Sequence, residues 1–167
     1  MFKLFHGAVR LVERDGAGQK LSKTDGYMAN AGLAFGAHST EGATAMSRII
    51  VMHTEGEDAP AVEHGQTPKE IYISGATDSR TWNHFTGEDN RLNCGIWERS
   101  PGKVSVDFKY WEFFHLIEGE VVITNENGES WTIRKGEAAI IPAGFKGTWD
   151  TVEPVRKHYV TLDSIAL

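Results

Sequence analysis

Several side chains that could move a proton, bind a ligand or hold a metal ion occur in the second half of the chain. Phe108, Tyr110, Glu112 and Phe114 recur at every second position, so they share one face if this segment is a β-strand. A carboxyl group among aromatic rings is poorly hydrated, which suits it to general acid–base chemistry. The chain also holds seven histidines and one cysteine, and imidazole and thiolate are common ligands of first-row metals.

The histidines and the cysteine show no ligand spacing that stands out. His53 and His64 lie in an acidic stretch that is typical of a solvated loop. His115 has the opposite parity to Glu112, so we expect it on the other face of the strand, packed at an interface rather than acting as a ligand. Cys94 has no fixed histidine partner in the sequence, and a small buried residue is the favoured interpretation over a nucleophile.

Short strands separated by turns must position these side chains. The predicted strands are Cys94–Glu98, Lys103–Tyr110, Phe113–Ile117, Glu120–Thr124, Ser130–Arg134, Glu137–Ile141, Thr148–Val152 and Lys157–Thr161. Turn residues separate them, among them the hairpin signal Asn125-Glu-Asn-Gly128. Without a helical period in this half, the pattern predicts an all-β sandwich or barrel.

The first part of the chain has a different character. Residues 1–66 are predicted to be an extension of unknown role, partly β through Ala8–Glu13 and Ser47–His53, and residues 67–167 the main domain. With 17 Lys and Arg against 23 Asp and Glu, the formal charge is −6, which argues against nucleic acid and anionic membranes as partners. A lone cysteine and no apolar run long enough for a leader or a membrane span predict a cytoplasmic protein.

Two separate motifs resemble those of the cupin superfamily. They are Gly102 with Glu112-Phe-Phe-His-Leu-Ile-Glu-Gly119, and Gly136-Glu-Ala-Ala-Ile-Ile-Pro142-Ala-Gly144. Flanking segments, such as Gly95-Ile-Trp-Glu98 and Arg156-Lys-His-Tyr-Val160, are similar to small cupins grouped with the ureidoglycine aminohydrolase cupin domain and the ethanolamine-utilisation Q protein. The resemblance covers residues 68–165. It implies a double-stranded β-helix, which is a jelly-roll barrel with a pocket at one mouth.

The same resemblance locates the expected metal site. A typical cupin supplies two histidines and a glutamate from the first motif and a third histidine from the second. Glu112 keeps the glutamate, whereas Val106, Phe108 and Gly147 occupy the three histidine positions. Apolar side chains cannot ligate an ion, and one carboxylate is a poor site for a divalent cation. We therefore expect no metal and no other cofactor, and a rearranged site through His115, His158 or an N-terminal histidine stays open.

The remaining inward set predicts an aromatic pocket for a small polar metabolite. The resemblance implies that Trp149, Lys157 and Tyr159 face the cavity with Phe108, Tyr110 and Glu112. Glu112 and Lys157 are the candidate acid and base of an isomerase, epimerase or lyase, while a buried Glu112–Lys157 ion pair that only orders the barrel is an equally weighted alternative. Phe108, Tyr110, Trp149 and Tyr159 are the candidate ligand contacts. Whether the protein is an enzyme is left open.

Two other functions remain as alternatives, together with one expected partner. The first is a metal-dependent aminohydrolase, and the second is a non-catalytic sensor or assembly module. The outer face of the strand with Trp111, Phe113 and His115 would expose an apolar patch on a monomer. A homodimer that buries this face is therefore expected.

Overall fold

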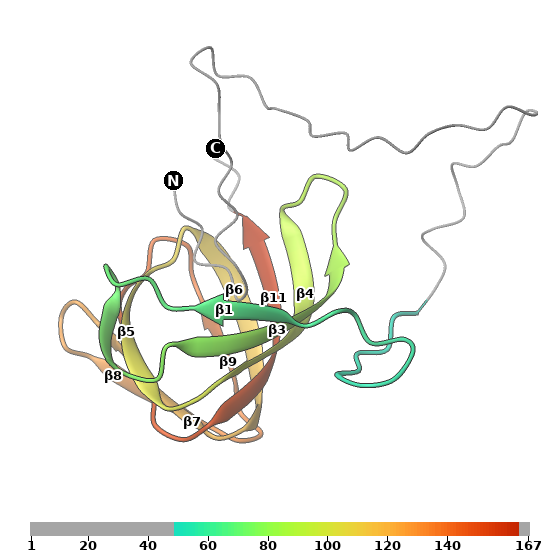
Figure 1. The fold of residues 1–167 in the computed structure, drawn as a ribbon. Coiled ribbons are helices and arrows are strands. Elements are labelled where there is room, and N and C mark those ends of the chain that lie inside the picture. Colours follow the sequence, from blue (N-terminus) through green and yellow to red (C-terminus); the bar gives the residue numbers. More distant parts are fainter. Residues whose placement is uncertain (1–48, 164–167) are drawn as a thin grey trace, which may run out of the picture. The chain divides into compact units, whose positions relative to one another are not determined.

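The computed structural model describes residues 49–163, which form eleven β-strands in two antiparallel sheets (Figure 1). The six-stranded sheet has the order β1 (Glu63–Gln66), β3 (Asp78–Thr86), β4 (Leu92–Arg99), β11 (Val155–Asp163), β6 (Tyr110–Glu118) and β9 (Ala138–Ile141). The five-stranded sheet has the order β2 (Tyr72–Gly75), β5 (Gly102–Asp107), β10 (Lys146–Thr151), β7 (Glu120–Asn125) and β8 (Ser130–Arg134). No helix among these residues is long and apolar enough to cross a bilayer. The all-β jelly-roll prediction is confirmed.

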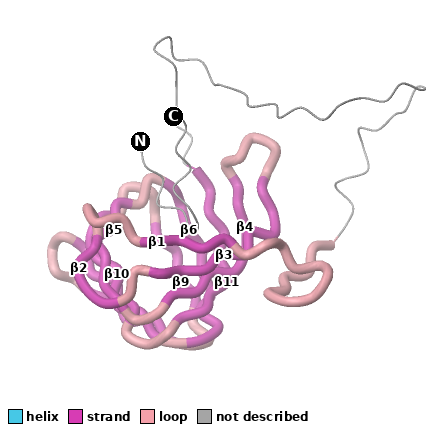
Figure 2. The backbone as a smooth tube through the Cα atoms, viewed as in Figure 1, coloured by secondary structure: helices cyan, strands magenta, loops and turns pink. Residues whose placement is uncertain are grey.

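The two sheets enclose one core, because each strand turns alternate side chains inward. On β6 the inward positions Glu112, Phe114 and Leu116 are fully buried, whereas the outward positions Trp111 and Phe113 are about half exposed. The main cluster of buried apolar residues draws on both sheets, with members that include Trp97, Tyr110, Phe114, Leu116, Tyr159, Val104, Val121, Ile123, Ile133 and Trp149. Figure 2 shows short loops joining the strands around this core.

Most strands after residue 92 form where the alternation places them, with one correction. The sequence predicts a single strand over Lys103–Tyr110, but β5 ends at Asp107 and β6 begins at Tyr110. The backbone of Phe108 forms its hydrogen bonds with a loop and not with a strand. Its amide donates to the carbonyl of Phe145, and its carbonyl accepts from the amide of Gly144. These bonds to the loop between β9 and β10 turn the chain from one sheet into the other.

The described end of the predicted extension joins the barrel. Residues 49–62 contain no strand, so Ser47–His53 is not a strand over the residues described, and Ala8–Glu13 lies outside them. β1, which falls within the predicted extension, pairs antiparallel with β3 through four residue pairs, from Glu63 opposite Thr81 to Gln66 opposite Asp78. The six-stranded sheet therefore begins before the boundary that the sequence suggests at residue 66.

The outer face of the six-stranded sheet carries an apolar patch around Phe113. Across the sheet, Phe113 lies opposite Ile140 on β9 and Val160 on β11. Phe113 and Ile140 are 45% and 65% exposed, so this face is uncovered among residues 49–163. The apolar patch predicted on the outer face of this strand is thus present, with Trp111 exposed as well, and the homodimer that would bury it stays a prediction.

Candidate functional site

Glu112 and Lys157 form an ion pair inside the barrel. Lys157 Nζ donates to Glu112 Oε1 at 2.5 Å, and both side chains are fully buried. Their backbones are not opposite each other, because Lys157 lies across from Leu116 while Glu112 lies across from Thr161. The lysine side chain therefore runs along the inner face to reach the carboxylate, and its length makes this possible. The sequence places both residues inward, and the structure brings them together.

Three aromatic rings enclose the ammonium group of Lys157. Nζ lies 4.2 Å from the ring centroid of Trp149, 4.7 Å from that of Trp97 and 4.9 Å from that of Phe114. Trp97 and Trp149 meet edge to face with their centroids 6.1 Å apart. A desolvated cation over an aromatic face gains about 2 kcal/mol. Burial lowers the pKa of Lys157, and the neighbouring Glu112 carboxylate opposes that shift. The rings and the carboxylate together hold the ammonium in place.

Two buried tyrosines lie near the ion pair. The Tyr159 hydroxyl and the side-chain amide of Asn83 hydrogen-bond at 3.1 Å. The ring of Tyr159 crosses β4 at Gly95, where a Cβ atom would come within 2.9 Å of the hydroxyl. Burial raises the pKa of Tyr159, and it raises that of Tyr110 well above the usual value. Both side chains therefore keep their hydroxyl protons.

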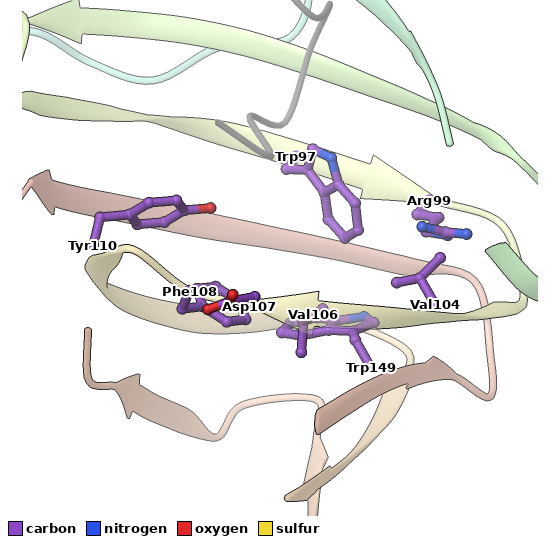
Figure 3. A pocket seen from close by; sticks show the side chains of 8 residues that line it. All are labelled: Trp97, Arg99, Val104, Val106, Asp107, Phe108, Tyr110 and Trp149. Carbon is purple, nitrogen blue, oxygen red and sulfur yellow. The ribbon is translucent and has the colours of Figure 1, made fainter. Parts of the chain in front are cut away.

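The two tryptophans also line a small cavity (Figure 3). Its volume is about 50 Å³, several times what one water molecule needs. In Figure 3, Tyr110 and Arg99 lie at opposite ends, with Trp97 on one side between them. The lining residues are Trp97, Arg99, Val104, Val106, Asp107, Phe108, Tyr110 and Trp149. Of the predicted site residues, Phe108, Tyr110 and Trp149 line this cavity, whereas Glu112, Lys157 and Tyr159 do not.

Arg99 supplies the positive charge of the cavity. The residue is only 8% exposed, and its Nη2 donates to the carbonyl of Ala76 at 2.9 Å. Its Nε has no hydrogen-bond partner among residues 49–163. Burial lowers the pKa of Arg99, an effect that Asp78 opposes, yet a guanidinium remains charged in proteins. The other charged group, Asp107, is paired with Lys109 at 2.6 Å.

Sequence analysis missed Arg99, although a signal existed. The predicted strand ends at Glu98, one residue short of the end of β4 at Arg99. Extending that strand by one position places Arg99 on the same face as Trp97, because the two residues differ by two. Alternation alone could therefore have added this arginine to the inward set.

The residues at the expected metal position do not fit a metal ion. Val106 lies directly opposite Gly147 across β5 and β10, so the positions where cupin histidines are expected are adjacent in this barrel. A side chain at Gly147 would overlap the backbone carbonyl of Thr124 on β7. Val106 and Phe108 carry no donor atom, and among residues 49–163 no group of three or more His, Cys, Asp or Glu side chains converges. Lys157 already neutralises the one carboxylate, Glu112.

His115 and His158 lie on the outer face of the sheet, as their parity predicts. They are opposite each other on β6 and β11, and their rings stack with centroids 6.0 Å apart. Burial lowers the pKa of His158, with further contributions from His115 and His84. Neither imidazole belongs to the inner cavity.

A second, wider groove lies between the edge strands β8 and β9. Its volume is about 680 Å³. Its lining residues are Ile123, Trp131, Thr132, Ile133, Glu137, Ala138, Ala139, Ile140, Ile141, Pro142 and Phe145. The groove is mostly apolar and contains none of the predicted site residues.

Comparison with known proteins agrees with the fold. Residues 86–159 match the family model of the EutQ-like cupin domain, and no curated protein matches the sequence. A DUF861-family protein of unknown function from Pseudomonas syringae pv. tomato is 31% identical with a TM-score of 0.56. The alignment covers 60% of this chain and 44% of that one, so the chain spans less than half of that protein's length.

Two further solved structures are similar over part of the barrel. A DUF861-family protein from Thermotoga maritima is 36% identical, with a TM-score of 0.38 and coverage of 38% of this chain and 73% of that one. The EutQ protein of Clostridium difficile is 24% identical, with a TM-score of 0.48 and coverage of 59% and 80%. From the family match and the two-sheet fold, the chain belongs to the cupin superfamily, in the group that carries the EutQ-like cupin domain.

Proposed function

We propose that this protein is a cupin that binds a small carboxylate-bearing metabolite without a metal ion. The observation that carries the proposal is the buried guanidinium of Arg99, whose Nε has no partner among residues 49–163, beside an aromatic cavity. A buried donor without an acceptor is costly, and a ligand carboxylate would remove that cost. Guanidinium groups bind carboxylates through charge-assisted hydrogen bonds, which are among the strongest in proteins.

The size and lining of the cavity restrict the ligand further. A volume of about 50 Å³ suits a molecule of a few heavy atoms. Tyr110 stands at the opposite end from Arg99 (Figure 3), and its hydroxyl keeps its proton because its pKa is raised. A small hydroxy or oxo acid, with its carboxylate at Arg99 and its second oxygen towards Tyr110, matches both ends. The rings of Trp97, Phe108 and Trp149 would contact its carbon atoms.

In this proposal Glu112 and Lys157 are positioning residues. Neither residue lines the cavity, but the lysine ammonium contacts the rings of Trp97 and Trp149, which do. The ion pair therefore helps to fix two rings of the cavity wall. Acid–base catalysis by this pair stays a prediction, because neither side chain lines the cavity.

Binding of a carboxylate that depends on Arg99 is the expected result. We expect calorimetric titration to show that glycolate, lactate or pyruvate binds the full chain, and that the corresponding amides bind at least about 10-fold more weakly. Arg99→Met should lower the affinity for the carboxylate by about 10- to 100-fold. The matched control is Arg91→Met, because Arg91 is exposed and paired with Asp89 outside the cavity.

A second variant separates lost binding from lost folding. Val106→Trp keeps Arg99 but fills the cavity that Val106 lines, so it should also abolish binding. Thermal melts show whether each variant is folded. The proposal fails if no small carboxylate binds, if amides bind as well as acids, or if folded Arg99→Met binds like the unsubstituted protein.

A further inference from the structure

The one carboxylate at the predicted metal-ligand positions, Glu112, already binds a cation. We infer that the Lys157 ammonium replaces the cupin metal ion, and that Glu112, Trp97, Trp149 and Phe114 form a binding site for a primary ammonium ion inside the barrel. Glu112, the one carboxylate left at the predicted ligand positions, holds Nζ at 2.5 Å. This inference concerns the ion pair and the rings around it, and it does not depend on the proposed carboxylate ligand.

The geometry around Nζ is that of an aromatic cage. Ring centroids within about 6 Å of a cation attract it, and Trp149, Trp97 and Phe114 all meet this limit at 4.2, 4.7 and 4.9 Å. Trp149 packs against both other rings, edge to face on Trp97 and tilted on Phe114 at 5.3 Å between centroids. The rings thus support each other and present their faces to one point.

The charge of the site favours an ammonium over a divalent metal. One carboxylate balances one positive charge, and aromatic faces stabilise a large, weakly coordinated cation without donor atoms. A divalent ion would instead need several oxygen, nitrogen or sulfur ligands, which Val106, Phe108 and Gly147 do not supply. The lack of donor atoms at the predicted ligand positions and the presence of a caged ammonium therefore fit the same conclusion: the site holds a monovalent cation instead of a divalent metal ion.

The site should accept a free ammonium ion once the lysine side chain is removed. Lys157→Ala deletes Cγ, Cδ, Cε and Nζ, which together correspond to propylammonium. The resulting cavity would retain the Glu112 carboxylate and the three ring faces. Because a ligand that binds only the folded state raises its stability, propylammonium should stabilise this variant.

Chemical rescue of full-length Lys157→Ala tests the inference. Propylammonium chloride should raise its melting temperature in a saturable manner, whereas 1-propanol, which has the same shape without the charge, and sodium chloride should not. The unsubstituted protein should show no such shift, and Lys157→Ala/Glu112→Gln should lose the rescue. Equal stabilisation by propanol would mean that only a void is filled, and this result or the absence of any stabilisation would overturn the inference.

If Lys157→Ala does not fold alone, a refolding experiment tests the same ammonium site. The variant is then diluted from urea into propylammonium, propanol or buffer, and the recovered folded fraction is measured by circular dichroism. Recovery with the amine alone supports the ammonium site. Equal recovery in all three conditions, or recovery in none, contradicts it. Calorimetric titration of carboxylates reports on the Arg99 cavity independently, so the failure of either proposal is distinguishable from failure of the other.

Discussion

Lys157→Met should lower the free energy of unfolding by about 3–5 kcal/mol. Methionine has a similar length but no charge, so the substitution leaves the Glu112 carboxylate buried without its cation. Both side chains are fully buried, and an unpaired charge in such a place is strongly destabilising. The three rings that face the ammonium would also lose a cation–π contact each.

Urea unfolding of a double-mutant cycle measures this coupling. Lys157→Met combined with Glu112→Gln removes both charges, so we expect the double variant to be more stable than Lys157→Met alone. The matched control is Lys109→Met, because Lys109 pairs with Asp107 at 2.6 Å with both side chains exposed. A surface pair of this kind contributes about 0–1 kcal/mol. A Lys157→Met variant as stable as Lys109→Met would contradict the buried-pair interpretation.

Gly147→Ala should lower the free energy of unfolding by about 1–3 kcal/mol. Gly147 is where the resemblance predicts the third histidine, and a Cβ atom there would overlap the carbonyl of Thr124 on the neighbouring strand β7. The strands β10 and β7 are paired, and Thr124 lies opposite Thr148, the residue that follows Gly147. Relief of the overlap therefore requires the backbone of β7 to move, because no flexible side chain is involved that could shift instead.

Gly87→Ala is the matched control for that substitution. A Cβ atom at Gly87 would lie 3.3 Å from Cβ of Leu92, a tight contact that a shift of a few tenths of an ångström relieves. Urea unfolding of both variants should show a clearly larger loss for Gly147→Ala. Equal stability of Gly147→Ala and the unsubstituted protein would show that this position can accept a side chain, and with it a histidine ligand.

The inward orientation of the site residues could be predicted from sequence by alternation, although Phe108 lies between β5 and β6. Phe108, Tyr110 and Glu112 differ by two, and the structure places all three inside the barrel. The resemblance added Trp149, on β10 in the other sheet, and Lys157, on the neighbouring strand β11. Alternation and the resemblance together are therefore enough to predict an aromatic interior with one acid and one amine.

The contacts between these residues depend on the registers of paired strands, which the sequence does not contain. Glu112 lies opposite Thr161 rather than Lys157, so only the offset between β6 and β11 shows that the lysine can reach the carboxylate. The closure of Trp97 and Trp149 over the ammonium likewise joins β4 to β10, which lie in different sheets. This packing places the ion pair against two rings that line the cavity, whereas the charged side chains of the lining itself are Arg99 and Asp107.

The end of β5 at Asp107 shows a similar limit. Alternation continues through Phe108 and Tyr110, and nothing local marks the break. The hydrogen bonds from the backbone of Phe108 go to Phe145 and Gly144, more than thirty residues away in the sequence. Tertiary contacts therefore override the local pattern at this corner of the barrel.

The central claim is that an internal ammonium ion replaces the metal ion of this cupin barrel. Elemental analysis by mass spectrometry tests it most directly, on full-length protein purified without chelator and then incubated with Mn²⁺, Fe²⁺, Ni²⁺ or Zn²⁺ and desalted. We predict far less than one metal ion per chain at a site that depends on Glu112. One equivalent of metal that is retained by the unsubstituted protein and lost in Glu112→Gln would contradict the account.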